Sequence, residues 1–389
     1  MRILAVSIAP LFPDSVHGGS QRILTEVARA LGEAGHEVRV LCSRRPENEG
    51  GFHLGRRVRV EPSLLLRGTF PSPYEVAPHR LAAVAAALRG GAEWADRVYL
   101  HADAVFMRHL LGGRPVVRSF HDFLYEEALV SAFSLPAALT IVPSEYLKRC
   151  IEASVGQTGA RPLEPVRVIP NGVDVPARRP RARPPKGVAP RVPGDIVLVH
   201  PHRPDVRKGI AASLALVREL SRRRPAARVR LLVAKHVDEG VSEEASGHHA
   251  LAMVMAQKLG VSRSIELFDW MPQARMPSLY AFADATLCIG NFIEAFGLVP
   301  LESVAAGTPA VCARVGALRE LEGVPGLSFV PHGDIPAAAD ALEGALAQDR
   351  AQAQGALREK FDPERMKAAY VEAITGRLPR PRPGRRATR

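Results

Sequence analysis

Two glutamates stand eight positions apart, Glu294 and Glu302, in the segment EAFGLVPLESVAAGTPAV of residues 294–311. An apolar run, ATLCIG, precedes the segment and is typical of a buried strand, and the apolar residues after Gly297 recur at helical spacing. A helix should therefore begin there, and its free N–H groups would form an anion site. Carboxylates beside that site suit hydroxyl groups, so the spacing indicates a ligand such as a sugar nucleotide. The alternative is an ordinary strand–helix unit with two solvated glutamates.

A basic cluster follows another apolar run, DIVLVH. Arg203, Arg207 and Lys208 stand close together before Gly209 in HPHRPDVRKGI, residues 200–210. Cations at a helix start suit a diphosphate, and arginine can bind phosphate through two hydrogen bonds. The cluster alone is also compatible with an ordinary basic surface loop.

Two shorter motifs follow predicted strands near the N-terminus. Gly18 and Gly19 lie in the loop PLFPDSVHGGSQR and permit close approach of the backbone to a ligand. His121 and Asp122 lie at the end of a predicted strand, in SFHDF. A lone histidine is as readily structural as functional, so His121 is a candidate because of its place at a strand end.

These motifs must be positioned by two successive series of strands and helices. RILAVSI, HEVRVLC, DRVYLH, RPVVRSFH and LTIVPS are strand candidates before residue 175, and DIVLVH, RVRLLVA, IELFDW, ATLCIG and TPAVCA follow residue 194. Helical stretches separate them, which predicts an α/β protein with two doubly wound parallel sheets. Ligands bind at the carboxyl ends of such strands. No G-x-G-x-x-G follows a strand, which disfavours a nicotinamide or flavin enzyme.

The formal net charge of +12 is confined to two segments. Residues 176–194 and residues 377–389 each hold six basic residues and no acidic one, so the rest of the chain is formally neutral. This distribution disfavours a nucleic-acid partner. Both segments are rich in proline and lack hydrophobic periodicity, so they are interpreted as a linker and a disordered basic tail. They serve solubility, or alternatively a weak electrostatic tether to an anionic membrane or polymer.

The remaining composition indicates a cytoplasmic protein. No apolar run approaches the ~18–20 residues that span a bilayer, and MRILAVSIAPLF is better explained as a first buried strand than as a signal peptide. The cysteines form no C-x-x-C pair, which disfavours a zinc site or a disulfide framework and fits a reducing compartment; they are Cys42, Cys150, Cys288 and Cys312. The tail, if it binds lipid, would place the protein at the inner membrane face.

Together these segments resemble the family 4 retaining glycosyltransferases of the GT-B fold, over residues 1 to about 376. The most specific similarity is the Glu294-x7-Glu302 pair. HRPDVRKG is similar to the family's Gly-Arg-x-x-x-x-Lys-Gly loop, and GGSQR, FHD, VPSEYLKR, IPNGVD and VGALREL occur in the matching order.

The resemblance implies two Rossmann-like domains that face a central cleft. The N-terminal domain, residues 1–175, would bind the acceptor, and the C-terminal domain, residues 195–360, would bind the nucleotide sugar. The linker 176–194 would join them. FDPERMKAAYVEAI resembles the helix that crosses back to the N-terminal domain, expected within residues 361–376, before the basic disordered tail 377–389.

The resemblance also implies roles for the diphosphate site. Arg203 and Lys208 would contact the donor diphosphate, and Gly18 and Gly19 would face it from the N-terminal loop. His202 stands where the family usually has a glycine before this arginine.

For the sugar and ribose, the resemblance implies that Glu294 contacts the donor sugar near its C3 hydroxyl, and that Glu302 binds the ribose hydroxyls. His121 would lie beside the sugar near the anomeric centre. Ala295 and Trp270 replace residues that are usually glycine, which leaves the donor base and sugar open. The amides around sugar and phosphate would be those of Phe296, Gly297, Leu298 and Val299.

The implied chemistry needs no metal and no cofactor beyond the nucleotide-diphosphate sugar as co-substrate. No two aspartates stand two positions apart, so the chain has no D-x-D metal motif. In the family's favoured scheme the acceptor attacks from the leaving-group face and a diphosphate oxygen helps to remove its proton. His121, Glu294, Arg203 and Lys208 are the candidate catalytic residues.

Other functions stay open at this stage. The acceptor could be a small molecule, a lipid or a glycan. A sugar-nucleotide epimerase of the GT-B fold is the first alternative, and a non-catalytic partner of another glycosyltransferase is the second. The matching Glu-x7-Glu and Arg-x4-Lys pairs favour the transferase.

Overall fold

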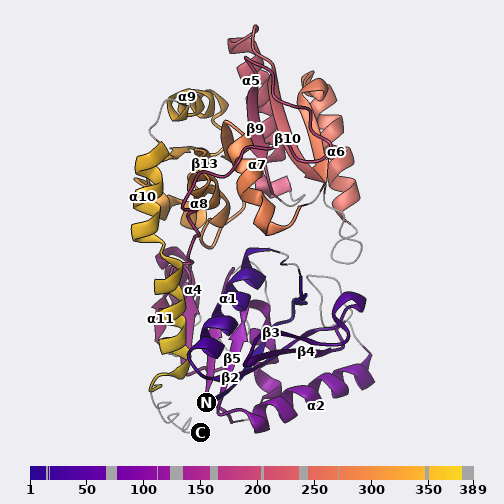
Figure 1. Cartoon of the computed structure of the whole chain (residues 1–389), viewed down its shortest axis with the longest axis vertical. Helices are drawn as coiled ribbons and strands as arrows, with labels where there is room; N and C mark the ends of the chain where they lie inside the picture. Colours follow the sequence, from indigo (N-terminus) through magenta and orange to yellow (C-terminus); the bar gives the residue numbers. More distant parts are fainter. Residues whose placement is uncertain are drawn as a thin grey trace. The chain divides into compact units, whose positions relative to one another are not determined.

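The chain folds into two compact units, Met1–Pro170 with Glu364–Arg389 and Asn171–Pro363 (Figure 1). Each unit is an α/β domain around one sheet. The computed structural model describes residues 1–14, 16, 18–66, 77–111, 113–122, 135–157, 165–202, 206–235, 244–269, 271–346 and 350–378.

The sheet of the first unit has the strand order β3-β4-β2-β1-β5-β6-β7-β8. Its strands pair in parallel except β3 with β4, which are antiparallel. The strands are β1 (Arg2–Val6), β2 (Glu37–Ser43), β3 (Phe52–Gly55), β4 (Val58–Leu64), β5 (Arg97–His101), β6 (Val116–Ser119), β7 (Leu139–Val142) and β8 (Val166–Val168). The helices are α1 (Gly19–Glu33), α2 (Pro78–Trp94), α4 (Glu145–Gln157) and α11 (Pro363–Thr375), with the 3-10 helices η1 (Pro46–Asn48) and η2 (Ala102–Leu110).

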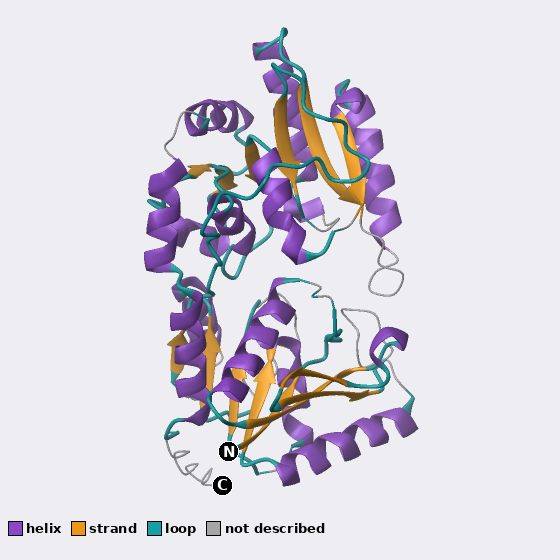
Figure 2. Cartoon of the chain, viewed as in Figure 1, coloured by secondary structure: helices purple, strands orange, loops and turns teal. Residues whose placement is uncertain are grey.

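The second unit has a parallel sheet with the order β11-β10-β9-β12-β13-β14, and helices flank this sheet (Figure 2). Its strands are β9 (Ile196–His200), β10 (Val229–Lys235), β11 (Ile265–Asp269), β12 (Ala285–Cys288), β13 (Ala310–Ala313) and β14 (Leu327–Val330). Its helices are α5 (Ile210–Arg223), α6 (Glu244–Leu259), α7 (Met276–Phe282), α8 (Leu298–Ala305), α9 (Ile335–Ala345) and α10 (Arg350–Lys360), with η3 (Val206–Lys208), η4 (Ser262–Ser264), η5 (Gln273–Arg275) and η6 (Gly316–Leu321).

The central strand β1 shows why the apolar runs become strands buried on both faces. Ile3 packs in one core with residues of α1 and α11. Leu4, on the opposite face, points toward Gly91 of α2, where an added Cβ would meet its side chain at 2.9 Å. Because successive side chains of a strand point to opposite faces, an unbroken apolar run serves both helix layers. The doubly wound prediction from such runs is confirmed.

The helix α11 belongs to the first unit although it ends the chain. Met366, Tyr370 and Ile374 are fully or almost fully buried in the core that contains Ile3. Arg97 on β5 donates a hydrogen bond of 2.9 Å to the carbonyl of Ile374. The apolar residues therefore recur every four positions, which is the spacing of one helix face.

The segment predicted as a linker, residues 176–194, is part of the second unit and covers the edge strand β11. Asp269 donates its backbone N–H to the carbonyl of Lys186 at 3.4 Å, and Arg230 donates to the carbonyl of Ala189 at 2.7 Å. Val188 is buried in the core of this unit. Proline-rich sequence thus shields a sheet edge that would otherwise be open to pairing.

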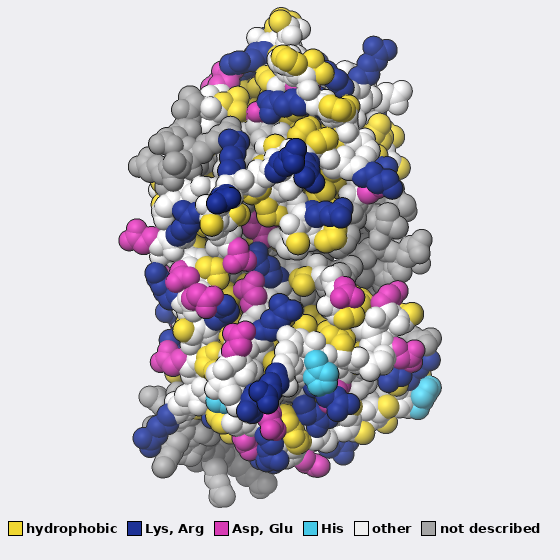
Figure 3. Space-filling model, viewed as in Figure 1, with side chains coloured by type: hydrophobic (Ala, Val, Ile, Leu, Met, Phe, Trp, Pro, Cys, Tyr) yellow, Lys and Arg dark blue, Asp and Glu magenta, His cyan; other side chains and the backbone are white. Residues whose placement is uncertain are grey.

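Of the predicted basic tail, residues 379–389 lie outside the described part of the chain. Within the described residues, none of the helices combines the length and apolarity needed to cross a bilayer. Lys and Arg side chains on the face shown in Figure 3 are scattered among acidic and neutral ones and form no continuous basic area.

Candidate active site

The loop after β12 leads into helix α8, which begins where the sequence predicts it. Gly297 precedes the helix in the left-handed region, with φ +104°, and an added Cβ would lie 2.5 Å from a Leu318 methyl group. Pro300 occupies the first turn, where no intrahelical N–H is needed. Gly307, with φ +85°, follows the helix. The first-turn N–H groups have no acceptor within the helix, and Pro300 of this turn lines the same pocket as Glu294.

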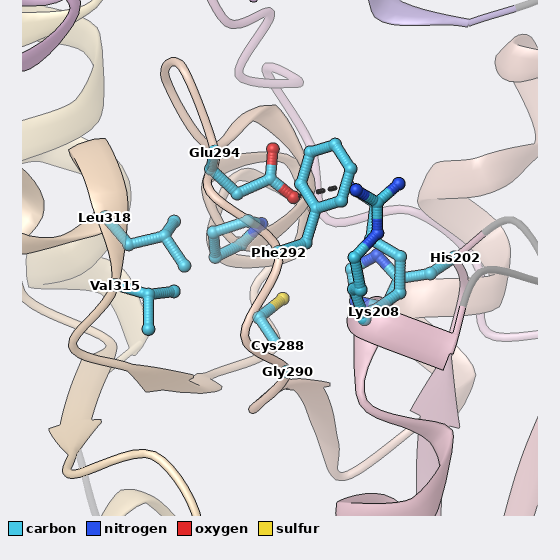
Figure 4. A pocket seen from close by; sticks show the side chains of 10 residues that line it. His202, Lys208, Cys288, Gly290, Phe292, Glu294, Val315 and Leu318 are labelled. Carbon is cyan, nitrogen blue, oxygen red and sulfur yellow. Dashed lines mark hydrogen bonds and ion pairs between the residues drawn. The ribbon is translucent and has the colours of Figure 1, made fainter. Parts of the chain in front are cut away.

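The strongest polar contact at this loop joins Lys208 and Glu294. The Lys208 Nζ lies 2.6 Å from Glu294 Oε1, and the two side chains are 12% and 25% exposed. The same Nζ lies 3.5 Å from the centre of the Phe292 ring. Figure 4 shows the carboxylate of Glu294 and the side chain of Lys208 pointing toward one another beside this ring. The lysine is therefore held by an opposite charge on one side and by an aromatic face on the other.

Close backbone contact fixes the two loops that carry this pair. Phe292 donates its N–H to the carbonyl of Arg207 at 2.8 Å. An added Cβ at Gly290 would lie 2.2 Å from the same carbonyl oxygen, and one at Gly209 would lie 2.5 Å from Gly290. Both positions therefore require glycine, and the β9–α5 and β12–α8 loops are locked together at the carboxyl ends of neighbouring strands.

A third segment completes the surroundings of Glu294. Ala317 at the start of η6 donates its N–H to the Glu294 carbonyl at 2.9 Å, and Gly316 approaches the same backbone with φ +51°. The pocket formed by the three segments (Figure 4) is lined by His202, Arg207, Lys208, Cys288, Gly290, Phe292, Glu294, Pro300, Val315 and Leu318.

Cys288 forms part of the pocket but is not placed to act as a nucleophile. Burial and the neighbouring Cys312 raise the pKa of the Cys288 thiol well above its ordinary value. A thiol attacks as its thiolate, so a protonated buried thiol is unreactive.

Glu302 has different surroundings from Glu294. It lies in α8 and is half-buried, and its Oε1 accepts a hydrogen bond of 2.8 Å from Gln273 Nε2 on η5. It does not line the pocket around Lys208. The two glutamates therefore face different neighbours, as two different parts of a ligand would require.

The residues whose amides are expected around sugar and phosphate use their side chains for packing in the core. The Phe296 side chain is buried, with its ring 5.7 Å from that of Phe361, so only its backbone faces the loop. Leu298 and Val299 are partly buried against the same core. Arg203, expected at the diphosphate, and Trp270, which replaces a usual glycine, lie outside the described residues.

In the first unit, Gly18 and Gly19 lead into α1, and His121 follows β6. Gly18 is exposed with φ +96° and immediately precedes the helix. His121 Nε2 lies 3.2 Å from Ser119 Oγ, and burial lowers the pKa of His121 to about 4. The imidazole is therefore neutral at pH 7 and can offer one donor and one acceptor.

Sequence reasoning missed several residues of the pocket. Phe292 was given no role, although it stands only two positions before Glu294. Val315 and Leu318 lie in VGALREL, a motif that was matched by its order alone and given no place in the site. Among the described residues, no three His, Cys, Asp or Glu side chains are grouped to hold a metal ion.

Known proteins share both units of this chain. Residues 17–177 match the family described as Glycosyltransferase Family 4, and residues 189–363 match Glycosyl transferases group 1. The chain is 28% identical to a D-inositol 3-phosphate glycosyltransferase of Thermobispora bispora, over 92% of this chain and 90% of the relative. It is 27% identical to a glycogen synthase of Mycobacterium tuberculosis, over 98% and 97%.

Solved structures agree on the fold. Sucrose-phosphate synthase from Thermosynechococcus elongatus superimposes with a TM-score of 0.72 at 18% identity, covering 96% of this chain and 97% of that one. Anabaena HepE in complex with UDP-glucose gives 0.69 at 19% identity, covering 96% and 99%. With two family matches that span most of its length and this two-domain architecture, the chain belongs to the family 4 glycosyltransferases and is a glycosyl-transferring enzyme of the GT-B fold.

Proposed function

We propose that this enzyme moves a sugar from a nucleotide-diphosphate sugar to an acceptor hydroxyl with retention of the anomeric configuration, without a metal ion. The observation that carries the proposal is the 2.6 Å contact between Lys208 and Glu294 beside the start of α8. It pairs a cation with a carboxylate in a pocket that the first turn of α8 also lines through Pro300, and these groups suit a diphosphate and a sugar hydroxyl side by side.

The lysine supplies the electrostatic part of the chemistry. As the bond from the anomeric carbon to the diphosphate breaks, negative charge grows on the leaving oxygens. Lys208 and the N-terminus of α8 stabilise that charge without rearranging, which lowers the barrier. Arg203, which stands five residues before Lys208, is expected to add a second cation from the same loop. Together these groups take the part that a metal ion plays in other transferases.

Glu294 takes a sugar hydroxyl in this scheme. In the free enzyme its carboxylate is paired with Lys208. When the donor binds, the diphosphate becomes an additional partner for the lysine, and Glu294 Oε1 and Oε2 can accept hydrogen bonds from the sugar. Glu302, held by Gln273, accepts from the ribose hydroxyls. The two carboxylates thus orient opposite ends of the donor.

The transfer itself needs no protein nucleophile. The acceptor oxygen forms its bond to the anomeric carbon on the face from which the diphosphate departs, and the acceptor proton passes to a diphosphate oxygen. The leaving group thus serves as the base. The protonated, buried Cys288 thiol is consistent with this scheme because it offers no competing nucleophile.

The likeness to HepE, which was crystallised with UDP-glucose, favours UDP-glucose as the first donor to test. The relatives' names include an inositol phosphate transferase and a glycogen synthase. Small polyols and their phosphates, oligosaccharides and lipids bearing a free hydroxyl are the acceptor classes to test with it.

The test measures UDP release from UDP-glucose in the presence of a metal chelator and these acceptors, and determines the anomeric configuration of the product by NMR. We expect UDP release that survives chelation and an α-linked product. Lys208→Ala should reduce turnover by about ten- to a hundredfold, the scale of one charged hydrogen bond, whereas Lys258→Ala on the exposed face of α6 serves as the matched control. Activity lost on chelation and restored by magnesium or manganese, or a β-linked product, would contradict the proposal.

A further inference from the structure

Beneath His121, the first unit contains a buried polar cluster that the scheme above does not use. Tyr99 and His101 lie at the end of β5, Ser119 ends β6, and Ser20 lies in the first turn of α1. Tyr99, His101 and Ser119 are 0%, 1% and 0% exposed. Buried polar groups in such numbers are costly unless every member is hydrogen-bonded, so the direction of each bond is constrained.

Ser20 determines the tautomer of His101. The His101 Nε2 lies 2.9 Å from the carbonyl oxygen of Ser20 and 2.9 Å from its hydroxyl. A carbonyl oxygen only accepts, so this nitrogen carries the proton. Burial lowers the pKa of His101 well below its ordinary value, so the ring is neutral and its Nδ1 is an acceptor.

The remaining directions follow from His101 Nδ1. The nearest donor to His101 Nδ1 is the Tyr99 hydroxyl at 2.8 Å, so this hydroxyl donates its hydrogen bond to Nδ1. The Ser119 oxygen lies 2.9 Å from the Tyr99 oxygen and 3.4 Å from His101 Nδ1. Ser119 must direct its proton to this side, because otherwise two oxygens 2.9 Å apart would face one another with no hydrogen between them. With that proton committed, Ser119 Oγ can only accept from His121 Nε2 at 3.2 Å. The chain of hydrogen bonds thus runs from His121 through Ser119 and Tyr99 to His101.

The backbone next to His101 is strained, and the His101 ring packs against that of His121. Ala102, the next residue, has φ +49°, a left-handed conformation that costs a non-glycine residue energy. The ring centroids of His101 and His121 are 4.3 Å apart. Such strain persists where the surrounding contacts over-determine the backbone. At its other end, His101 holds Ser20, directly after Gly18 and Gly19.

We propose that His101 is a positioning residue, which holds His121 in the Nε2–H tautomer through Tyr99 and Ser119 and anchors the glycine loop through Ser20. The catalytic part of this inference rests on the proposed function, because His121 would then present a fixed ring and an Nδ1 acceptor to the donor sugar. The hydrogen-bond assignment itself does not depend on which reaction is catalysed.

Replacing His101 by leucine should reverse the direction of the hydrogen bonds between Tyr99, Ser119 and His121. In His101→Leu, the Tyr99 hydroxyl loses its acceptor and its nearest remaining partner is Ser119 Oγ. Ser119 must then donate to His121 Nε2, which forces His121 into the Nδ1–H tautomer, the less favoured form of a free imidazole. In His101→Asn, an amide oxygen near the former Nδ1 position can still accept from Tyr99, so the original direction and the Nε2–H tautomer should be kept.

The experiment is NMR of protein labelled with 15N in the histidine rings, with the His121 signals assigned by comparison with His121→Asn. We expect Nε2–H in the wild type and His101→Asn, and Nδ1–H in His101→Leu. Thr308→Val is the matched control, because it removes another buried hydroxyl hydrogen bond, to the Tyr280 carbonyl at 2.6 Å in the second unit, and should leave the tautomer unchanged. If His101→Leu does not fold, Ser119→Ala should still remove the protection of the His121 Nε2–H from solvent exchange.

Turnover of UDP-glucose supplies the second readout. We expect kcat of His101→Leu to fall by about tenfold with little change in the donor KM, and kcat of His101→Asn to stay near that of the wild type. An unchanged His121 tautomer in His101→Leu, or a changed tautomer with unchanged kcat, would overturn the positioning role. Absence of turnover in the wild type would count against the proposed function, while the tautomers would still decide the hydrogen-bond assignment.

Discussion

At the scale of single residues, two neighbouring tyrosines of the first unit differ in how their hydroxyl groups are satisfied. The rings of Tyr99 and Tyr370 meet edge to face, with centroids 6.4 Å apart, and both are fully buried. The Tyr99 hydroxyl bonds to His101 and Ser119. The Tyr370 hydroxyl has no hydrogen-bond partner among the described residues. Burial raises the pKa of both groups, so both remain protonated at neutral pH.

Replacing each tyrosine by phenylalanine should therefore change stability in opposite directions. Tyr370→Phe removes an unsatisfied buried hydroxyl and should stabilise the protein by about 1 kcal/mol. Tyr99→Phe leaves His101 Nδ1 with only the more distant Ser119 hydroxyl, at 3.4 Å, and should destabilise the protein by about 1–3 kcal/mol. Thermal unfolding of both variants measures the two shifts in Tm, with each variant as the control for the other. A lower Tm for Tyr370→Phe would show that its hydroxyl is satisfied after all.

At the scale of elements, the start of α8 depends on how tightly the β12–α8 loop packs on η6. Gly297 combines a left-handed conformation with side-chain contact to Leu318 and Leu321, which an added Cβ would approach to 2.5 and 3.2 Å. This contact fixes the turn that leads into α8, whose Pro300 lines the pocket together with Glu294. Gly333, before α9, has φ +85° but nothing within 4 Å of an added Cβ. Substitution of Gly333 therefore measures the cost of the left-handed backbone conformation without any steric clash.

Gly297→Ala should therefore destabilise the protein more than Gly333→Ala. The left-handed conformation costs alanine about 1–2 kcal/mol at either position. Overpacking against Leu318 adds about 1–3 kcal/mol at Gly297 alone. At about 2–4 °C of Tm per kcal/mol for a unit of this size, the two variants should separate clearly in thermal unfolding. Equal Tm values would mean that η6 moves away without cost, and that the turn is less rigid than its contacts indicate.

At the scale of the whole molecule, the architecture was predictable because it follows from the spacing of apolar residues and from the order of strands and helices along the chain. Apolar runs such as that of β1 are buried on both faces, and the helical spacing of Met366, Tyr370 and Ile374 identifies α11. These signals are local in sequence. The association of residues 176–194 with β11 was not predictable, because its backbone groups bond to the backbone of Asp269 and to the side chains of Arg230 and Glu266, and such contacts leave no hydrophobic period.

The candidate site also has features that could be predicted from the sequence and features that could not. The helix start at Gly297 and the cation Lys208 could be placed from the sequence, because each adjoins a strand end. Their direct pairing with Glu294 and Phe292 could not, because it depends on how two loops 86 residues apart in sequence pack through Gly209 and Gly290. His101 was missed because it stands inside a strand pattern, where a buried histidine carries no distinguishing signal.

In the proposed scheme, Glu294 and Glu302 bind different parts of the donor. Glu302 would hold the ribose, a group unchanged by transfer, so Glu302→Ala should weaken UDP binding by about ten- to a hundredfold, as loss of a charged hydrogen bond implies. Glu294 would touch the sugar and competes for Lys208 in the free enzyme. Glu294→Ala should therefore lower kcat strongly while UDP binds as tightly as to the wild type, or more tightly.

Calorimetric titration of both variants with UDP, which carries the ribose and the diphosphate but no sugar, tests this division most directly. We expect a large loss of UDP affinity for Glu302→Ala and none for Glu294→Ala. Equal losses of UDP affinity in the two variants would contradict it.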